Sequence, residues 1–303
     1  VFEKNEVVKD NGEWYSVFSP YAKRWKANLT DYQLKPYPNK KYFKNYLKHE
    51  PVNVPTLESM GFTPKTDHLP APEVSTTIVE KYHETRDIPS IQGTTRISMH
   101  LRFGTVSIRQ LAKLGLTKNE KWLNELIWRD FYMMILHHNP HVVDSAFKPR
   151  YDRVQWRNNE EEFERWCKGE TGYPIVDAGM RELNTTGFMH NRVRMITASF
   201  LVKHLLIDWR WGEAYFAAKL NDFELSSNNG GWQWASSSGC DAAPYFRVFN
   251  PELQTKKFDP KLIYVKKWVP EVNSIRYQQS AIVDHKFARE RVLKVYKEAL
   301  DQS

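Results

Sequence analysis

The stretch NNGGWQWASSSGCDAAPYFRVFNP, residues 228–251, places two indoles, Trp232 and Trp234, directly after a pair of glycines. Aromatic faces of this kind stack on nucleic-acid bases and on planar cofactors. Glycine has no Cβ, so the pair lets the backbone pass close beneath a flat ring. Because the glycines disfavour a core helix, we expect an extended backbone in which the two indoles face different ways.

A second set of candidate residues follows Thr117-Lys118-Asn119-Glu120, which has the form of a capping box that opens a helix. One face of that helix is an ordinary core stripe: Leu123, Leu126, Ile127, Phe131 and Met134. The opposite face, at i, i+3, i+4 and i+7, carries Glu125, Trp128, Arg129 and Tyr132. A solvent face with one Glu–Arg pair is the simple interpretation. Since Trp and Tyr suit open solvent poorly, we favour the wall of a polar-lined cavity.

The helix expected over residues 189–207 repeats this arrangement, with Asn191, Arg194, Met195 and Ala198 on one face. Arg194 lies between apolar neighbours, so its burial would require a partner anion. The acids of the run NDFE, Asp222 and Glu224, are the candidates. A buried Arg–Asp pair beside a ligand would hold charge in a fixed geometry.

Two shorter motifs are candidates for ion-binding sites, one for phosphate and one for a metal. Residues 93–98, GTTRIS, offer hydroxyls and free amides where a helix begins, as phosphate sites do, although Thr and Ser are also ordinary caps. The run is not a P-loop, because the Gly-Lys-Ser/Thr sequence is missing. Residues 137–141, HHNPH, lack the glutamate of a zinc motif and contain a helix-breaking proline. We therefore expect no metal site.

The elements that position these residues are helical from about residue 76 onward, with another helix through PIVDAGMRELN and a surface helix over residues 284–300. Residues 1–75 are irregular and rich in proline, which indicates a long connector over a surface. A connector of that length normally joins domains, so we expect a further domain upstream. The predicted division is 1–75 for the connector and 76–303 for a mainly α domain.

Composition limits the function classes. The net charge of +8 favours a polyanionic partner, nucleic acid first, although lysines scattered for solubility give the same balance. No run approaches the roughly 18 apolar residues of a membrane span, and no leader peptide is visible. Cys167 and Cys240 are too few for a disulfide framework. We expect a protein of the cytoplasm or nucleoid that is neither secreted nor membrane-bound.

Four runs together resemble one family: WLNELIWRDFY from Trp122, RVQW, TGYPIVDAGMRELNTTGFMHNRVRMITASFLVKHLLIDWR, and the opening stretch. In this order, and over nearly all of residues 76–271, they resemble class I cyclobutane pyrimidine dimer DNA photolyases. Residues 1–30 resemble the end of that family's N-terminal α/β antenna domain, which we expect to be largely absent here. The resemblance implies an all-helical domain that holds FAD. The antenna chromophore, of folate or deazaflavin type, is not assignable.

The resemblance also implies the residues that hold FAD. Those for the pyrophosphate and ribityl region are Tyr82, Thr94, Thr95, Arg96, Ile97 and Ser98. Those that line the flavin are Trp122, Arg129, Asn191, Arg194, Asp222, Phe223 and Glu224. Asn228 would face the flavin N5, where its amide oxygen accepts the N5–H of the reduced ring. Plant-type cryptochromes tend to carry Asp at this place and animal ones Cys, so Asn228 favours repair over signalling.

The implied reaction is an electron transfer from light-excited FADH⁻ to a dimer flipped out of the duplex, followed by ring splitting and return of the electron. The catalytic residues would be Glu125, Trp128, Met195, Asn228 and Trp234, with the two indoles stacking on the pyrimidines. DNA contacts would come from Arg86, Glu125, Trp128, Asn191, Arg192, Trp234 and Gln254. A relay of Trp232, Trp209 and Trp156 would restore the reduced flavin from the surface. We expect a monomer.

Three positions depart from the family pattern. Glu224 replaces a shorter acid, Phe188 a Trp, and Cys240 a small residue such as Thr. The main alternative is a cryptochrome-type photoreceptor on the same fold, against which Asn228, Met195 and Trp234 argue. A (6-4) photolyase would carry a His near Met195. A DNA-binding helical protein without a cofactor is the remaining alternative.

Overall fold

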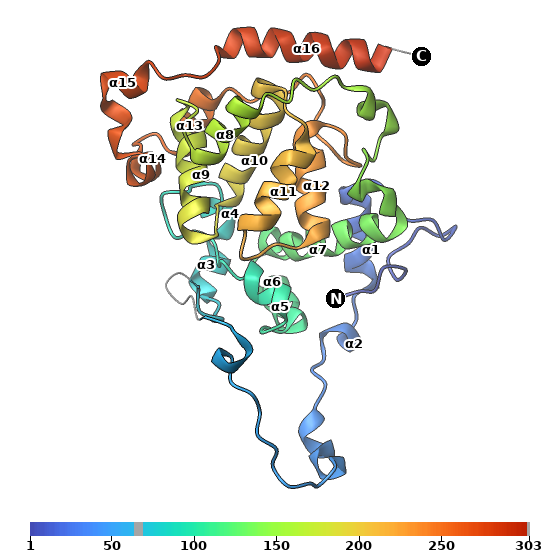
Figure 1. Cartoon of the computed structure of the whole chain (residues 1–303). Coiled ribbons are helices and arrows are strands. Elements are labelled where there is room, and N and C mark those ends of the chain that lie inside the picture. The colour runs from blue at the N-terminus through green and yellow to red at the C-terminus, as the bar shows by residue number, and fades with distance from the viewer. Residues whose placement is uncertain (64–68, 302–303) are drawn as a thin grey trace.

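The computed structural model describes residues 1–63 and 69–301, so that part of the predicted connector, residues 64–68, lies outside the described residues. Within these ranges every regular element is a helix and none is a strand (Figure 1). The prediction of a mainly α fold is therefore confirmed. None of the described helices is long and apolar enough to cross a membrane.

The α-helices of the described residues are α1 Phe18–Asn28, α2 Asp31–Leu34, α3 Thr76–Glu80, α4 Tyr82–Thr85, α5 Ser98–Phe103, α6 Ile108–Lys118, α7 Glu120–His138, α8 Glu160–Lys168, α9 Pro174–Thr186, α10 Asn191–Ser199, α11 Trp209–Lys219, α12 Leu225–Ser236, α13 Pro251–Phe258, α14 Ile263–Trp268, α15 Ile275–Gln278 and α16 His285–Asp301. A π-helical segment, η5 Phe200–Leu205, continues α10. The 3-10 turns are η1 Asn39–Asn45, η2 Glu58–Met60, η3 Pro140–Val143, η4 Pro149–Arg153 and η6 Pro270–Asn273.

Helix α7 crosses the lower ends of the bundle formed by α9 to α12, and α16 lies across the opposite end (Figure 1). Along its length α7 packs against α1, α4, α6 and α12, whereas α16 packs against η5 and η4. The predicted core stripe of α7 is confirmed, because Leu123, Leu126, Ile127, Phe131 and Met134 are all buried. The opposite face of α7 is thereby turned toward α4 and α12.

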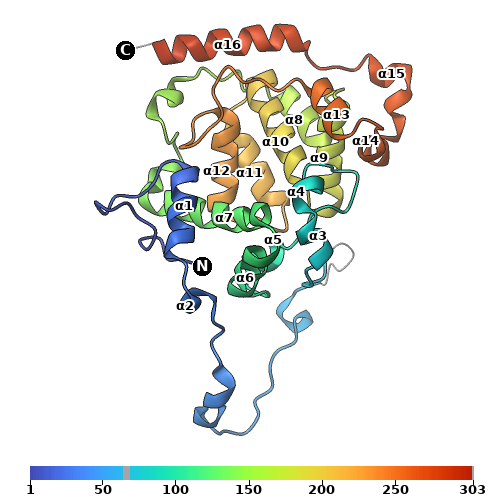
Figure 2. The same ribbon diagram turned by 180° about the vertical axis from the view of Figure 1, so that it is seen from behind.

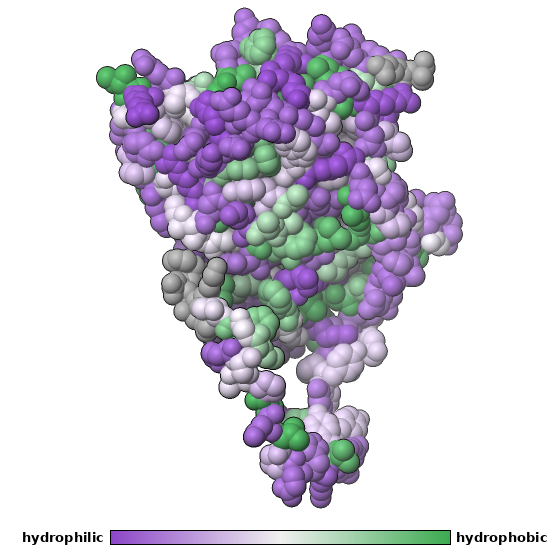
Figure 3. All heavy atoms as spheres, viewed as in Figure 1, coloured by the Kyte–Doolittle hydropathy of each residue, from purple (hydrophilic) through white to green (hydrophobic). Residues whose placement is uncertain are grey.

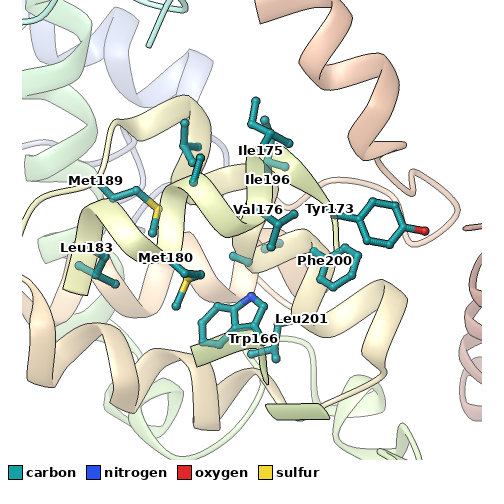
Figure 4. Close-up of a cluster of buried hydrophobic side chains, with 14 of the residues drawn as sticks. Trp166, Tyr173, Ile175, Val176, Met180, Leu183, Met189, Ile196, Phe200 and Leu201 are labelled. Carbon is teal, nitrogen blue, oxygen red and sulfur yellow. The ribbon is translucent and has the colours of Figure 1, made fainter. Parts of the chain in front are cut away.

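The largest hydrophobic cluster fixes α9 against α10 and α8. The indole of Trp166 is completely buried beside Val176, Met180 and Leu201 (Figure 4). Its Nε1 donates to the Thr197 carbonyl oxygen at 3.1 Å, so the one polar atom of the ring is satisfied. Burial of each such apolar side chain contributes about 1.5–3 kcal/mol, which holds α10 rigidly as a support for side chains on its other face.

The N-terminal residues pack on the helical domain. Helix α1 contacts α7 (Figure 2), and the fully buried Trp25 donates its Nε1 to Asp130 at 2.9 Å. Residues 35–62 instead form a long excursion with exposed Phe43 and Leu47, where hydrophobic and hydrophilic residues alternate on the surface (Figure 3). The predicted boundary at residues 75 and 76 stays a prediction, but α1 shares a hydrophobic cluster with α7.

The predicted capping box before α7 is wrong. Asn119 is the cap, and its side-chain oxygen accepts from the backbone N–H groups of Lys121 and Trp122 at 2.9 and 3.2 Å. Thr117 still belongs to the last turn of α6, where its hydroxyl donates to the Lys113 carbonyl oxygen at 3.2 Å. The N-cap residue of α7 is therefore Asn119, two residues after the predicted Thr117. The shift arises because α6 continues to Lys118 and leaves only Asn119 between the two helices.

The expected extended backbone at the glycine pair is also wrong, since both indoles lie in α12. Successive residues of a helix turn by about 100°, so residues i and i+2 point in nearly opposite directions, whereas an extended chain would place them on one face. The glycine serves packing: a Cβ at Gly230 would lie 2.2 Å from the Tyr132 ring of α7. The close approach of α12 to α7 outweighs the low helix propensity of glycine.

Candidate functional site

The predicted ion pair between Arg194 and Asp222 is confirmed. Arg194 Nη2 lies 2.9 Å from Asp222 Oδ2, and Ser98 donates its hydroxyl to the same oxygen at 2.6 Å. Burial alone would raise the pKa of Asp222, but the charge and hydrogen bond of Arg194 and the Ser98 hydroxyl outweigh it and lower that pKa below its usual value. Asp222 is therefore a fixed carboxylate that joins α10 to α5.

The other oxygen of this carboxylate, Asp222 Oδ1, is buried and has no hydrogen-bond partner among the described residues. A buried acceptor without a donor is costly, at about 1–3 kcal/mol. Arg129, half-buried on α7, and Asn191, exposed at the start of α10, likewise make no side-chain hydrogen bond or ion pair within the described part of the chain. These groups leave donors and acceptors available for a bound molecule.

Asn228 lies on α12 with its amide fixed from one side. Its Nδ2 donates to the Glu213 carbonyl oxygen at 3.1 Å, which leaves Oδ1 as the free acceptor. Gly231 is three residues further along the same helical face, and no atom of a different element lies within 4 Å of the place where its Cβ would be. An acceptor oxygen therefore stands beside open space on α12, as a flat ring requires.

Glu224, predicted at the flavin edge, also has a local structural role, and its predicted place at the flavin stays a prediction. It is the N-cap of α12, and its carboxylate accepts from the backbone N–H groups of Ser226 and Ser227 at 2.9 and 3.0 Å. Burial would raise the pKa of Glu224, but the hydroxyls and amides of both serines lower it. Phe223, next to it, is held through its carbonyl oxygen by Arg102 Nε at 2.9 Å. The structure therefore accounts for Glu224 by helix capping.

The turn predicted to hold an anion precedes α5. Arg96 has a positive φ of 51°, a left-handed conformation that bends the chain sharply, and its guanidinium lies 4.5 Å from the centroid of the Phe188 ring. Thr94, Thr95 and Arg96 line a cavity of about 230 Å³ together with Ser75 and Gln92. Ile97 and Trp122 are buried, at 6% and 3% exposed, so both side chains belong mainly to the core. Tyr82 packs beside them in the same cluster.

A row of charges joins α7 to α10 and to the residues that end and follow α4. Arg86 Nη1 is 2.5 Å from Glu125 Oε1, and Arg192 Nη2 is 2.8 Å from Asp87 Oδ1. Desolvation raises the pKa of Glu125, and the charge and hydrogen bond of Arg86 only partly oppose it. Arg192 Nη1 also reaches Met195 Sδ at 3.5 Å. The predicted DNA-contacting arginines are thus brought together with the predicted catalytic Glu125 and Met195. The place of Asp87 in this row of charges was not predicted from the sequence.

Gln254 and Trp234, the other two predicted DNA contacts, lie on α13 and α12. The Arg192 guanidinium lies 4.5 Å from the centroid of the Phe258 ring, and Gln254 is four residues before Phe258 on the same face of α13. Trp234 is half-buried at 6.3 Å from the Phe249 ring. Both residues are therefore on helices that contact α10, Gln254 on α13 and Trp234 on α12, and their contact with DNA stays a prediction.

Trp128 is partly covered by a residue that sequence reasoning missed. Phe18, the first residue of α1, stacks on it with ring centroids 3.6 Å apart and ring planes 3° from parallel. The Phe18 backbone N–H is fixed by Asp241 Oδ2 at 3.1 Å. The Trp128 ring also contacts Phe131 and Tyr132, with centroids 5.6 and 5.4 Å away, so stacking on a base is restricted to what these three rings leave open. No local pattern signals the contact of Phe18 with Trp128, because 110 residues separate the two rings in the sequence.

The three relay indoles lie in or beside the core. Trp232 and Trp209 are 2% and 1% exposed, and Trp156 is half-buried with its ring centroid 6.1 Å from that of Tyr296. The ring contacts of Trp232 are with Phe216 at 5.0 Å and with Trp166 at 6.1 Å. Gly212 makes this packing possible, since a Cβ there would lie 2.1 Å from the Trp232 ring. The relay itself stays a prediction.

No three His, Cys, Asp or Glu side chains come together as metal ligands in the described part of the chain. His137 and His141 of the HHNPH run are both exposed. The two cysteines are unpaired, and burial raises the pKa of the Cys240 thiol to about 11 and that of Cys167 to about 12. Neither thiol is therefore activated as a nucleophile near neutral pH.

Comparisons with known proteins show the family and the fold. A model of the FAD binding domain of DNA photolyase matches residues 122–280. The deoxyribodipyrimidine photo-lyase of Vibrio cholerae is 40% identical over 99% of this chain and 71% of its own length. The crystal structure of a bacterial class III photolyase from Agrobacterium tumefaciens superposes with a TM-score of 0.82 at 32% identity, covering 98% of this chain and 71% of that one. A Synechocystis cryptochrome structure, with a TM-score of 0.71 over 97% of this chain and 69% of its own, is 23% identical and shows the fold alone.

Proposed function

From the premise that this chain belongs to the DNA photolyase family, we infer that it repairs cyclobutane pyrimidine dimers in DNA with the energy of light. The activity is that of a carbon–carbon lyase, deoxyribodipyrimidine photo-lyase, and the cofactor is FAD. The observation that supports the inference best is the pair of acceptor oxygens without protein partners among the described residues, Asp222 Oδ1 before α12 and Asn228 Oδ1 on α12, the latter beside the open space at Gly231.

These residues fit FAD. A flavin ring presents N–H donors, which match an ionised carboxylate and an amide oxygen. Arg194 and Arg129 would face the ring, while Tyr82 and residues 94–98 would hold the pyrophosphate. When bound in its reduced form, FAD supplies the electron that opens the cyclobutane ring after light is absorbed. The Asn228 amide oxygen would stabilise the reduced state by accepting a hydrogen bond, which an Asp or Cys at that position would not do in the same way.

The row of charges on α4, α7 and α10 would receive the lesion. Arg86, Arg192 and Gln254 are proposed to contact the DNA backbone, and the net charge of +8 supplies long-range attraction to phosphate. Trp128 and Trp234 offer stacking surfaces for a dimer flipped out of the duplex, and Met195 offers an apolar contact. Glu125 is proposed to contact the pyrimidine edge; burial raises its pKa, so protonation, which would let it donate a hydrogen bond to a carbonyl oxygen, is easier than for an exposed glutamate.

We further propose that Trp232, Trp209 and Trp156 deliver electrons to the flavin site from the surface. Two of them are buried in one hydrophobic cluster, where a low dielectric and fixed ring positions favour short transfer steps. Trp156 is the member closest to solvent. The protein is proposed to act as a monomer on DNA in the cytoplasm or nucleoid.

The test uses purified protein reconstituted with FAD, reduced with dithionite, and mixed with an oligonucleotide that contains one thymine dimer. Near-UV or blue light should convert the dimer to two thymines, whereas the sample kept in the dark should retain it. Loss of dimers is measured by chromatography of the DNA. If FAD is bound and reduced and no dimers are lost in the light, the assignment is wrong. The cryptochrome alternative has support from the fold alone, and it predicts that negative result.

A further inference from the structure

Four charged side chains form a continuous row at the proposed lesion site: Glu125, Arg86, Asp87 and Arg192. Arg86 pairs with Glu125 at 2.5 Å, and Arg192 pairs with Asp87 at 2.8 Å. A distance of 3.9 Å from Arg86 Nε to Asp87 Oδ1 links the two pairs. Three separate elements contribute to the row, since Arg86 and Asp87 follow α4, Glu125 lies on α7 and Arg192 lies on α10.

Asp87 holds Arg192 in one orientation. A single oxygen, Oδ1, accepts from both Nη2 at 2.8 Å and Nε at 3.2 Å. The remaining Nη1 is directed to Met195 Sδ at 3.5 Å, and the plane of the guanidinium lies against Phe258. Arg192 is thus fixed by a carboxylate, a thioether and a ring, although the Asp87 side chain itself remains 40% exposed.

A phosphate that approaches Arg192 must share its guanidinium with Asp87. The carboxylate repels the phosphate at close range, and this repulsion opposes every DNA molecule equally. The fixed orientation of Arg192 does distinguish between DNA molecules, because it favours only a DNA backbone whose phosphates already lie where Arg192 points. A flipped dimer can supply such a match together with the contacts of Met195 and Trp234, whereas a regular duplex has to pull Arg192 away from Asp87.

We propose that Asp87 is a positioning residue that sets the preference of this site for dimer-containing DNA over undamaged DNA, by fixing Arg192 and opposing its capture by ordinary phosphates. The inference rests on the proposed function. Without the Asp87 carboxylate, Arg192 is free to follow any phosphate, so undamaged DNA should gain affinity. Dimer-containing DNA gains from the lost repulsion but loses the fixed arginine, so its affinity should change little.

The experiment compares the parent, Asp87→Asn and Glu298→Gln, all loaded with FAD. Binding of a duplex with one thymine dimer and of the same duplex without it is measured in the dark by fluorescence anisotropy at several salt concentrations. Glu298→Gln adds the same unit of positive charge on α16, at the opposite end of the molecule from α4 and α7 (Figure 1). It controls for net charge alone.

In Asp87→Asn the preference for the dimer should fall by about fivefold, mainly through tighter binding of the undamaged duplex. In Glu298→Gln the preference should stay within about twofold of the parent. Since Asp87 is argued to act through Arg192, a second pair of variants tests the route. Adding Asp87→Asn to Arg192→Ala should change the preference by less than about twofold.

The inference is overturned if Asp87→Asn keeps the parent's preference for the dimer. It is also overturned if adding Asp87→Asn to Arg192→Ala lowers that preference as much as Asp87→Asn lowers it in the parent. Asp87→Ser replaces the carboxylate by a smaller, uncharged side chain and is measured in the same way. If Asp87→Asn is unstable, the result for Asp87→Ser tests the inference in its place. A failure of the proposed function is distinguishable, because the parent would then show neither preference for the dimer nor its loss in light.

Discussion

Two carboxylates of the proposed site, Asp222 and Glu125, each pair with an arginine, and their pKa values shift in opposite directions. Burial acts to raise the pKa of both. For Asp222 the Arg194 charge and the Ser98 hydroxyl outweigh burial, and the pKa is lowered. For Glu125 desolvation outweighs Arg86, and the pKa is raised. Two differences contribute: Asp222 accepts from two side-chain donors and Glu125 from one, and the negative charge of Asp87 adds to burial at Glu125.

This comparison separates two kinds of chemistry. A carboxylate with a lowered pKa is a permanent anion, suited to accept hydrogen bonds from a bound cofactor. A carboxyl with a raised pKa gains a proton more readily, and in that form it donates a hydrogen bond to a carbonyl oxygen. When a phosphate draws Arg86 away, Glu125 loses the one charge that opposes its protonation. The proposed flavin site therefore carries a carboxylate that stays charged, and the proposed lesion site carries one whose charge depends on its surroundings.

The largest effect should come from Asp222→Asn, which leaves Arg194 without a counter-charge. Removing one partner of a buried pair costs about 3–5 kcal/mol, and because a quarter of the Arg194 side chain is exposed we expect about 3 kcal/mol of lost unfolding free energy. Bound FAD should fall in parallel. Denaturant unfolding and the flavin absorbance of the purified protein measure the two quantities. Glu13→Gln, which breaks the exposed pair with Lys9, is the matched control and should change neither.

The pair Glu125→Gln and Glu125→Ala tests the other carboxyl. Gln retains a hydrogen-bond donor in the place of the protonated acid, so the quantum yield of dimer splitting should fall only a few-fold. Ala removes the donor, and the yield should fall by about tenfold, as expected for one lost hydrogen bond to a developing charge. Steady illumination of dimer-containing DNA at saturating concentration gives both yields. Equal losses in the two variants would mean that Glu125 acts by charge.

Sequence reasoning found the residues of this comparison but not their surroundings. Arg194 and Asp222 were paired correctly because an arginine between apolar neighbours requires an anion and the nearest acids were few. The roles of Phe18 and Asp87 were missed, because stacking on Trp128 and pairing with Arg192 are contacts across about 100 residues of chain. The helix α12 was missed because the local propensity of two glycines points away from the packing against Tyr132 that decides the conformation.

The pH dependence of stability should have opposite signs in the two regions. The Asp222 pKa is lowered on folding, so its contribution is present above its unfolded pKa of about 4 and is lost as pH falls through the folded value. The Glu125 pKa is raised on folding, so the folded protein is penalised as pH rises above about 4. Relative to the parent, Glu125→Gln should gain unfolding free energy between pH 4 and 7. Chemical denaturation at each pH measures this, and a difference that is flat over the range would contradict the raised pKa.

The smallest effect should come from Ser98→Ala, which removes one of the two donors to Asp222 and leaves the ion pair with Arg194. We expect a loss of about 1 kcal/mol in unfolding free energy, the usual net contribution of a single hydrogen bond. Ser59→Ala, which removes an exposed bond to the Thr56 carbonyl oxygen, should lose less. The pKa of Asp222 should move toward that of Glu125, because one donor is then left against burial. If the number of donors decides between a fixed anion and a responsive acid, the onset of acid destabilisation should shift to higher pH in Ser98→Ala and remain unchanged in Ser59→Ala.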